Sequence, residues 1–379
     1  MKIALVIKDY SLKKGGLERY VVNLSRELIN MGHDVHVFAN LRDTPEYSGI
    51  TFHHVPIIKF SFILKNFSFV ANSRRLLKQN KFDIINGFSR IYPLDVYRIG
   101  HKVRRHLLKV QYPNRLKKIL KYLSIKHLTI LYLEGQVFKK KNYQKIIANS
   151  ELGKQHAICY HAVPEKNIEV IYNGVDPDKF NSQVKGLYRD ETRKKLGIKK
   201  NEIVLLFVGR NFKLKGVKTI IESVPLLGQG KEKVRILIVG KGKSSYFLRL
   251  AKKLNVENKI IFAGESSQIE KFYAAGDIFV FPTFYDPFAN VCLEALACGL
   301  PVITTRMNGA SEIIKNGMNG YVVEDYTSPD ELAARITDIL PKDLRKNMSA
   351  CAFETAKEYT PSNNAARVEK LYKNILKNK

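Results

Sequence analysis

The sequence predicts an α/β protein with two doubly wound, Rossmann-like domains that face each other across a cleft. The chain has 379 residues, which is more than one ordinary hydrophobic core accommodates. Short apolar runs of strand length alternate with amphipathic helical segments, the pattern of parallel sheets covered on both faces. The alternation stops at a turn-rich segment, NGVDPDKF at 173–180, and then begins again. Ligands of such sheets bind beyond the carboxyl ends of the strands, and therefore in the cleft.

The first domain is expected to span residues 1–172. It opens with the apolar strand KIALVI at 2–7. Segment 15–32 then repeats apolar residues at helical spacing until Gly32 ends the helix, and a strand follows at 33–39. Further strands are expected at 50–57, 82–88, 94–99 and 145–150.

The second domain is expected to span residues 173–361. Its strands are short, uninterrupted apolar runs typical of buried parallel strands. They are expected at 202–209, 234–240, 259–264, 277–283 and 301–305, with helical segments between them. Residues 362–379 form one more predicted helix, which is expected to cross back to the first domain.

Charge is the most unusual feature of the composition. The chain carries a formal net charge of +29, so its partner is expected to be anionic: a nucleic acid, an acidic membrane or a phosphorylated substrate. No apolar run approaches the ~18–20 residues that a membrane-spanning helix needs. The four cysteines have no metal-type spacing, so no metal site is predicted and a reducing cytoplasm is expected.

A basic loop follows the first strand of the second domain. In VGRNFKLKGV at 208–217, Arg210 and Lys215 lie between a strand and the start of a helix. Cations beside the positive end of a helix form an anion site suited to a diphosphate. The alternative is a solvated basic loop.

Two further strand-to-helix turns are rich in glycine. Gly240 and Gly242 lie in VGKGKSS, which matches neither GxGxxG nor the P-loop, so a standard dinucleotide or Walker site is disfavoured. These glycines either allow a ligand to approach the backbone or shape a tight turn. Gly15 and Gly16 follow the first strand, where backbone N–H groups could meet a phosphate.

The segment YDPFANVCLEALACG at 285–299 contains two acids that packing of an apolar core does not explain. Asp286 lies in a loop and Glu294 lies inside an apolar helix, where an unpaired carboxylate is costly to bury. A carboxylate accepts hydrogen bonds well from vicinal hydroxyls, and sugars present such pairs. The alternative is a buried Glu294 paired to a lysine.

Together these segments resemble the family 4 retaining glycosyltransferases of GT-B architecture, and the resemblance covers essentially the whole chain. The segments that carry it are 15–38, 173–176, 210–216 and 286–305. The last of them matches the family's E-x7-E signature, with Asp286 in the first position. The chain is most similar to the lipopolysaccharide core hexosyltransferases, because of PLDVYRIGH at 93–101 and the basic helices behind it.

The resemblance implies a role for each predicted site residue. Glu294 would hold the ribose of a nucleotide sugar, and Asp286 would contact the donor sugar, with a reach one methylene shorter than that of the family's Glu. A histidine or acid of the first domain would lie near the reacting sugar, and the candidates are His101 and Asp95. The donor diphosphate would be bound by Arg210, Lys215, Gly15, Gly16 and the backbone of Ala289, Asn290 and Val291, while Gly240 and Gly242 would belong to the nucleotide-binding loop.

The resemblance also implies an activity. The enzyme would transfer a hexose with retention of anomeric configuration, without a metal or any cofactor besides the nucleotide-sugar co-substrate, for which UDP-glucose is the best candidate. The acceptor would be an anionic lipid-linked or phosphorylated saccharide, or a lipopolysaccharide core. The alternative within the same fold is an acceptor from another glycan: capsule, exopolysaccharide or glycolipid.

The charge is concentrated in residues 98–145, which hold fourteen Lys or Arg and one acid, Glu134. Leu116, Ile119, Leu120 and Leu123 share a helical face there, and a basic amphipathic helix is typical of a membrane-surface binder. The aromatic segment 60–70 is either an apolar edge near the acceptor cleft or a core helix. We expect a cytoplasmic protein attached peripherally to the inner membrane. A nucleic-acid-binding protein is the alternative, but no nucleic-acid-binding motif accompanies the charge, so no nucleic acid is expected.

Overall fold

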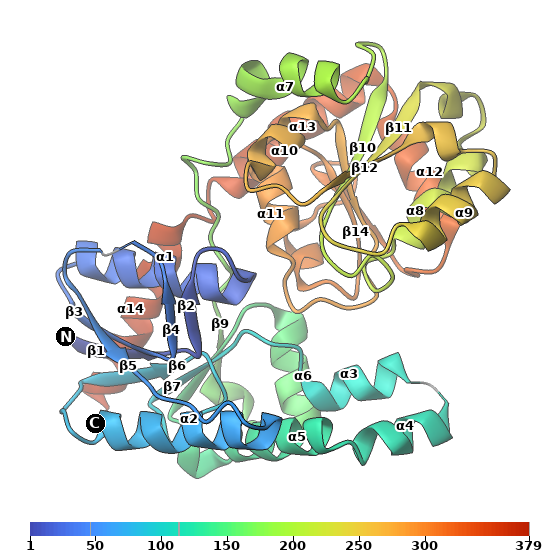
Figure 1. The fold of residues 1–379 in the computed structure, drawn as a ribbon. Coiled ribbons are helices and arrows are strands. Elements are labelled where there is room, and N and C mark those ends of the chain that lie inside the picture. The colour runs from blue at the N-terminus through green and yellow to red at the C-terminus, as the bar shows by residue number, and fades with distance from the viewer. Residues whose placement is uncertain (46, 113, 379) are drawn as a thin grey trace. The chain divides into compact units, whose positions relative to one another are not determined.

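The chain folds into two compact units in the computed structural model. One unit is Met1–Gly174 with Pro361–Lys379, and the other is Val175–Thr360. The structure describes residues 1–45, 47–112 and 114–378, and it gives the backbone alone for 115–118 and 231. Figure 1 shows each unit as a sheet with helices on its faces.

The N-terminal unit is built on a seven-stranded parallel sheet in the order β5-β3-β1-β6-β7-β8-β9. The strands are β1 (Lys2–Val6), β3 (Asp34–Ala39), β5 (Ile50–His54), β6 (Ile84–Gly87), β7 (Val96–Ile99), β8 (Lys145–Ala148) and β9 (Ile168–Val170). A small parallel pair, β2 (Asp9–Ser11) and β4 (Leu41–Asp43), lies apart from this sheet.

Two cores cover the two faces of this sheet. Side chains alternate along a strand, so Ile3 and Leu5 of β1 join one core while Ala4 and Val6 join the other. The first core includes side chains of α1 (Gly16–Asn30) and α14 (Pro361–Lys377). The second includes side chains of α2 (Phe62–Leu77), α5 (Ile125–Val137) and α6 (Glu151–His161). Helices α3 (Arg104–Gln111) and α4 (Arg115–Tyr122) precede α5.

The terminal helix α14 belongs to the N-terminal unit. Asn364 Oδ1 accepts the Tyr20 hydroxyl of α1 at 2.8 Å, and Asn86 of β6 donates to the Tyr372 hydroxyl at 2.6 Å. Tyr372 is fully buried. The last residues of the chain therefore complete the core that the first residues begin.

The C-terminal unit has a six-stranded parallel sheet in the order β12-β11-β10-β13-β14-β15. The strands are β10 (Ile203–Val208), β11 (Val234–Val239), β12 (Ile260–Gly264), β13 (Ile278–Phe281), β14 (Val302–Thr305) and β15 (Gly320–Val323). The helices are α7 (Val184–Lys195), α8 (Val217–Ser223), α9 (Ser245–Lys253), α10 (Ile269–Ala275), α11 (Asn290–Ala297), α12 (Pro329–Ile339) and α13 (Lys342–Ala356).

The predicted α/β class with two Rossmann-like, parallel-sheet domains is confirmed, and each predicted strand corresponds to a strand of the structure. The sequence reading gave no strand at β9 or β15, nor at the short pair β2 and β4. Short 3-10 segments occur at Lys140–Asn142, Glu165–Asn167, Val224–Lys233, Glu257–Lys259 and Gly309–Ile313. Among the described residues, no helix is long and apolar enough to cross a membrane.

Candidate active site

The order of the C-terminal sheet reverses between β10 and β13. Strand connections run outward in opposite directions from this pair, which is where doubly wound sheets bind ligands at the carboxyl ends of their strands. The loop after β10 carries Arg210 and Lys215, and the loop after β13 carries Asp286. Three of the predicted site residues therefore follow the two strands at the switch point.

Lys215 and Asp286 form an ion pair that joins these two loops. Lys215 Nζ contacts Asp286 Oδ2, and the two side chains are only 15% and 18% exposed. The ammonium group also lies 5.1 Å from the ring centroid of Phe281, the last residue of β13. An anionic ligand that bound Lys215 would leave the Asp286 carboxylate available to another partner.

Backbone geometry fixes the Lys215 loop against β13. Asn211 and Gly216 both have positive φ, and a Cβ on Gly216 would lie 2.0 Å from the Pro282 carbonyl oxygen. The Leu214 carbonyl accepts the Phe284 N–H at 3.0 Å. A glycine is therefore required where the two loops approach most closely.

Asn308 holds the Asp286 loop from the other side. It is fully buried, and its Oδ1 accepts the N–H groups of Ala289 at 3.0 Å and Ala310 at 3.2 Å. The Asp286 backbone pairs with neighbours of Asn308, donating to Met307 and accepting from Gly309. Sequence reasoning missed Asn308, because an Asn before a Gly ordinarily indicates only a turn.

The buried Glu294 has a tyrosine partner. Glu294 is 5% exposed on α11, and its Oε2 accepts the Tyr273 hydroxyl at 2.8 Å. Burial, followed by the nearby Glu294 carboxylate, raises the pKa of Tyr273 well above its ordinary value, so the phenol stays protonated. The structure places Tyr273 on this oxygen, whereas the alternative drawn from the sequence was a lysine.

The backbone N–H groups at the start of α11 are predicted to bind the donor diphosphate. The helix begins at Asn290, with Ala289 as its cap. The Ala289 N–H already donates to Asn308, so it is not available to a diphosphate in this structure. The Val291 carbonyl lies 3.3 Å from the Tyr273 hydroxyl.

Arg210 has a different ion-pair partner from Lys215. Its guanidinium lies 3.0 Å from Glu265, which follows β12, and both side chains are exposed. Exposed pairs of this kind contribute only about 0–1 kcal/mol, so a diphosphate could displace Glu265 at little cost.

Gly240 and Gly242 have packing explanations. A Cβ on Gly240 would lie 2.0 Å from the Gly209 carbonyl oxygen, and a Cβ on Gly242 would lie 2.3 Å from the Phe212 ring. The close approach is thus to the neighbouring loop of the same unit. These contacts explain both glycines by the tight turn, so no ligand is needed to account for them.

The N-terminal unit has its own pocket of about 150 Å³. Its walls come from the residues that follow β1, β6 and β7, and from α1, α2 and α5. They are Ile7, Lys8, Asp9, Leu17, Glu18, Asn66, Phe69, Ser89, Arg90, His101, Ile130 and Leu133. Polar groups of both signs beside an aromatic ring suit a hydroxyl-rich ligand.

His101 lies in this pocket, at the carboxyl end of β7. Burial, followed by the nearby Arg90 cation, lowers the pKa of His101 to about 3, so its ring is neutral at physiological pH. Burial and the nearby Lys65 lower the pKa of Lys8 to about 8, and Lys8 Nζ donates to Asn66 Oδ1 at 2.7 Å. Arg90 is held by the buried Glu134 at 3.3 Å.

The structure does not support Asp95 as a residue near the reacting sugar. Asp95 directly precedes β7, and its carboxylate accepts the Ile85 N–H at 2.8 Å and the Gln144 side chain at 2.6 Å. His101 follows the other end of the same four-residue strand, which spans roughly 13 Å. Asp95 therefore joins segments at the amino edge of the sheet, opposite the pocket.

Gly15 and Gly16 open helix α1, whose start helps to form the same pocket. Gly15 is the cap residue, and a glycine has no side chain of its own with which to cap the helix. A Cβ on Gly15 would lie 2.5 Å from the Glu18 carboxylate, so the Glu18 side chain folds back over the start of the helix.

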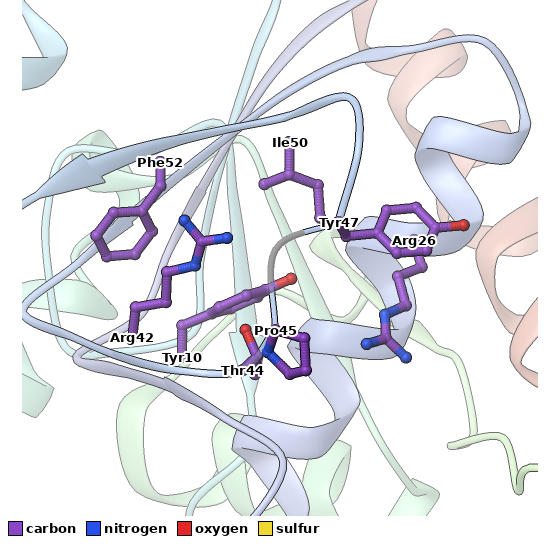
Figure 2. Close-up of a pocket in the computed structure, with 8 residues that line it drawn as sticks. All are labelled: Tyr10, Arg26, Arg42, Thr44, Pro45, Tyr47, Ile50 and Phe52. Carbon is purple, nitrogen blue, oxygen red and sulfur yellow. The ribbon is translucent and has the colours of Figure 1, made fainter.

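Figure 2 shows a second, much smaller pocket in the N-terminal unit. Its volume of about 10 Å³ suits a water molecule at most. Arg26 stacks on the Tyr47 ring at 5.2 Å and Arg42 on the Phe52 ring at 5.5 Å, so aromatic rings occupy its walls. No predicted site residue lines it.

Known proteins resemble both halves of the chain. The model described as Glycosyltransferase Family 4 matches residues 14–179, and the model described as Glycosyl transferases group 1 matches residues 188–355. An uncharacterized glycosyltransferase of Methanocaldococcus jannaschii is 28% identical, with 90% of this chain and 89% of the relative covered. The lipopolysaccharide glucosyltransferase WaaG of Escherichia coli K12 is 26% identical, with 91% and 90% covered.

Solved structures agree at the level of the fold. The crystal structure of WaaG superposes with a TM-score of 0.82 at 22% identity, over 98% of this chain and 99% of that one. The Anabaena protein HepE in complex with UDP-glucose superposes with a TM-score of 0.73 at 20% identity, over 99% and 100%. The chain therefore belongs to the family 4 type of GT-B glycosyltransferases and is related to the lipopolysaccharide core hexosyltransferases.

Proposed function

We propose that the protein transfers a hexose from a nucleotide sugar, with UDP-glucose as the first candidate, to a lipid-linked or lipopolysaccharide core acceptor. The observation that carries the proposal is the Lys215–Asp286 pair at the sheet's switch point, with the buried Glu294 on the helix that follows the Asp286 loop. The solved complex of HepE with UDP-glucose and the name of the relative WaaG support the choice of donor.

In the proposed reaction the acceptor hydroxyl oxygen bonds to the anomeric carbon as the bond from that carbon to the diphosphate breaks. Negative charge develops on the diphosphate, so Lys215 and Arg210 would stabilise the transition state more than the ground state. The departing phosphate oxygen would take the proton of the acceptor hydroxyl on the same face of the sugar. Anomeric configuration would then be retained without a metal.

Thermal shift against nucleotide sugars tests the donor site. We expect stabilisation by one nucleotide series from a panel of UDP-glucose, UDP-galactose, UDP-N-acetylglucosamine, GDP-mannose and ADP-heptose. The shift is expected to persist in EDTA and to be much smaller in Glu294→Ala, because that change removes the carboxylate that would accept the ribose hydroxyls. The exposed Glu257→Ala provides a matched control, with the same chemical change on a short 3-10 segment. No shift with any donor would contradict the proposal.

The pocket around His101 is the proposed acceptor site. It lies at the carboxyl ends of the strands of its own sheet, and it offers Lys8 and Arg90 to an anionic group as well as Asp9 and Glu18 to hydroxyls. His101 has a neutral ring, so it can both donate and accept a hydrogen bond with a sugar.

The outer faces of α2, α4 and α5 form the proposed membrane surface. Phe67 and Tyr132 are in ring contact at 5.7 Å, and Lys126 Nζ lies 5.7 Å from the Phe62 ring, so α2 and α5 contact each other (Figure 1). Its exposed apolar side chains are Phe60, Phe62, Ile63, Leu64, Phe67, Ile119, Leu120, Leu123, Ile125, Leu128 and Tyr132. The predicted Leu116 lies outside the described side chains, as do Arg115, Lys117 and Lys118.

This surface would attach the protein to the cytoplasmic face of the inner membrane. Phe60 is 92% exposed, whereas Phe69 of the same aromatic segment is buried, so the segment supplies both an outer apolar edge and core residues. Large exposed apolar patches mark interaction sites, and Lys65 of α2, Lys121 of α4 and Lys126 of α5 are exposed on the same helices.

Co-sedimentation with vesicles tests this attachment. Lys121→Glu/Lys126→Glu is expected to lower the affinity for vesicles with a third of anionic lipid by at least about tenfold, since each cation near such a surface contributes about 1 kcal/mol. The control Lys194→Glu/Lys200→Glu changes two exposed lysines of the other unit by the same charge and is expected to bind nearly as the parent protein does. Equal binding to neutral and anionic vesicles would contradict the electrostatic contribution.

A further inference from the structure

The Tyr273 hydroxyl lies where it can set the orientation of the Glu294 carboxylate. Tyr273 is on α10 and fully buried, with its ring packed edge-on against Phe180 at 5.6 Å and tilted against Phe279 at 5.9 Å. Its hydroxyl donates to Glu294 Oε2 at 2.8 Å and lies at the longer distance of 3.3 Å from the Val291 carbonyl. A rigid ring thus presents one donor to one carboxylate oxygen.

We propose that Tyr273 is a positioning residue whose hydroxyl orients Glu294 so that the site distinguishes a ribonucleotide from a deoxyribonucleotide. This inference rests on the proposed function, in which Glu294 binds the ribose hydroxyls. Tyr273 itself acts through Glu294 and contacts no substrate in this scheme.

The backbone position of Glu294 is already restricted. Its helix α11 is held at its start by Asn308, and at its end Lys185 Nζ donates to the Gly299 carbonyl at 2.8 Å. The terminal torsion of a Glu side chain is nevertheless broad, so the helix alone does not fix the plane of the carboxylate. A hydrogen bond from a fixed phenol does fix it, and a site built to bond a hydroxyl rejects the analogue that lacks it.

The phenol is suited to this role over the whole working pH range. Burial and the Glu294 charge raise the pKa of Tyr273, so its hydroxyl stays protonated and donates a hydrogen bond to Glu294.

Calorimetric titration of nucleoside diphosphates tests the inference. The probes are UDP, or the diphosphate of the base that the donor panel selects, and its 2′-deoxy and 3′-deoxy counterparts. The parent protein is expected to prefer the ribonucleotide by about tenfold or more, as charge-assisted hydrogen bonds allow. Tyr273→Phe is expected to reduce this preference by at least about threefold, although the ring and its packing remain.

Tyr372→Phe is the matched control. Tyr372 is equally buried, and its hydroxyl accepts from Asn86 at 2.6 Å, but it belongs to the N-terminal unit. Both variants lose one buried hydroxyl, so both are expected to melt at lower temperature, and only Tyr273→Phe is expected to change the ratio of affinities. An unchanged ratio in a folded Tyr273→Phe protein would overturn the inference.

A double variant separates this inference from the proposed function. In a Glu294→Ala background the ribose preference is expected to be absent, and adding Tyr273→Phe is expected to change it no further. If Glu294→Ala loses the preference while Tyr273→Phe keeps it, the inference fails and the proposed function stands. If Glu294→Ala keeps the preference, or if no diphosphate binds the parent protein, both fail.

Discussion

Lys215→Ala is expected to lower turnover by about two to three orders of magnitude while the protein stays folded. Lys215 is the cation at the switch point of the sheet, and only 15% of its side chain is exposed, so water compensates its loss poorly. The charge that develops on the departing diphosphate would then lack its nearest counterion. Initial rates of nucleoside diphosphate release, with the donor that the panel selects, measure the effect.

Lys213→Ala is the control for this change. Lys213 lies on the same loop, is exposed, and is expected to retain most of the activity. Arg210→Ala is expected to fall between the two, with a loss of at least about tenfold, because Arg210 is exposed and must first leave Glu265. Near parental turnover in Lys215→Ala would refute its contact with the diphosphate.

Gly216→Ala is expected to destabilise the C-terminal unit by about 3 kcal/mol or more. The residue has φ of +79°, and the added methyl group would lie 2.0 Å from the Pro282 backbone oxygen, so the two loops must separate. These loops carry Lys215 and Asp286, and separating them would break the ion pair as well. Urea unfolding followed by circular dichroism measures the loss of stability.

Gly197→Ala distinguishes steric conflict from backbone strain. Gly197 has a similar φ of +66°, but nothing lies within 4 Å of its added Cβ. It is therefore expected to cost only the strain of a left-handed residue, roughly 1–2 kcal/mol. Equal losses in the two variants would show that the approach of the two loops is not the controlling contact.

The fold could be predicted from the sequence because its signals are local. Buried parallel strands such as β10 and β13 are unbroken apolar runs, and the glycine and cation positions after them follow directly along the chain. Strand β15, GYVV, is only four residues long and only partly buried in its middle, which leaves little apolar signal.

The site could be predicted only in part, because partners distant in sequence carry no local signal. Lys215 and Asp286 were each selected from their own loops, but their pairing depends on the neighbouring strands β10 and β13. Tyr273 reads as an ordinary apolar helix residue until the fold places it beside Glu294. Asp95 was selected from a motif near His101, and only strand direction reveals that the two lie at opposite sheet edges.

The return of α14 to the N-terminal unit affects the order in which the protein can be completed during synthesis. Domains generally fold as units as the chain emerges from the ribosome. The C-terminal unit ends at Thr360, whereas the N-terminal unit needs Pro361–Lys379 as well. The unit whose synthesis begins first is therefore completed last. Until α14 with Tyr372 has been synthesised, part of the apolar face on which α14 packs stays exposed to solvent.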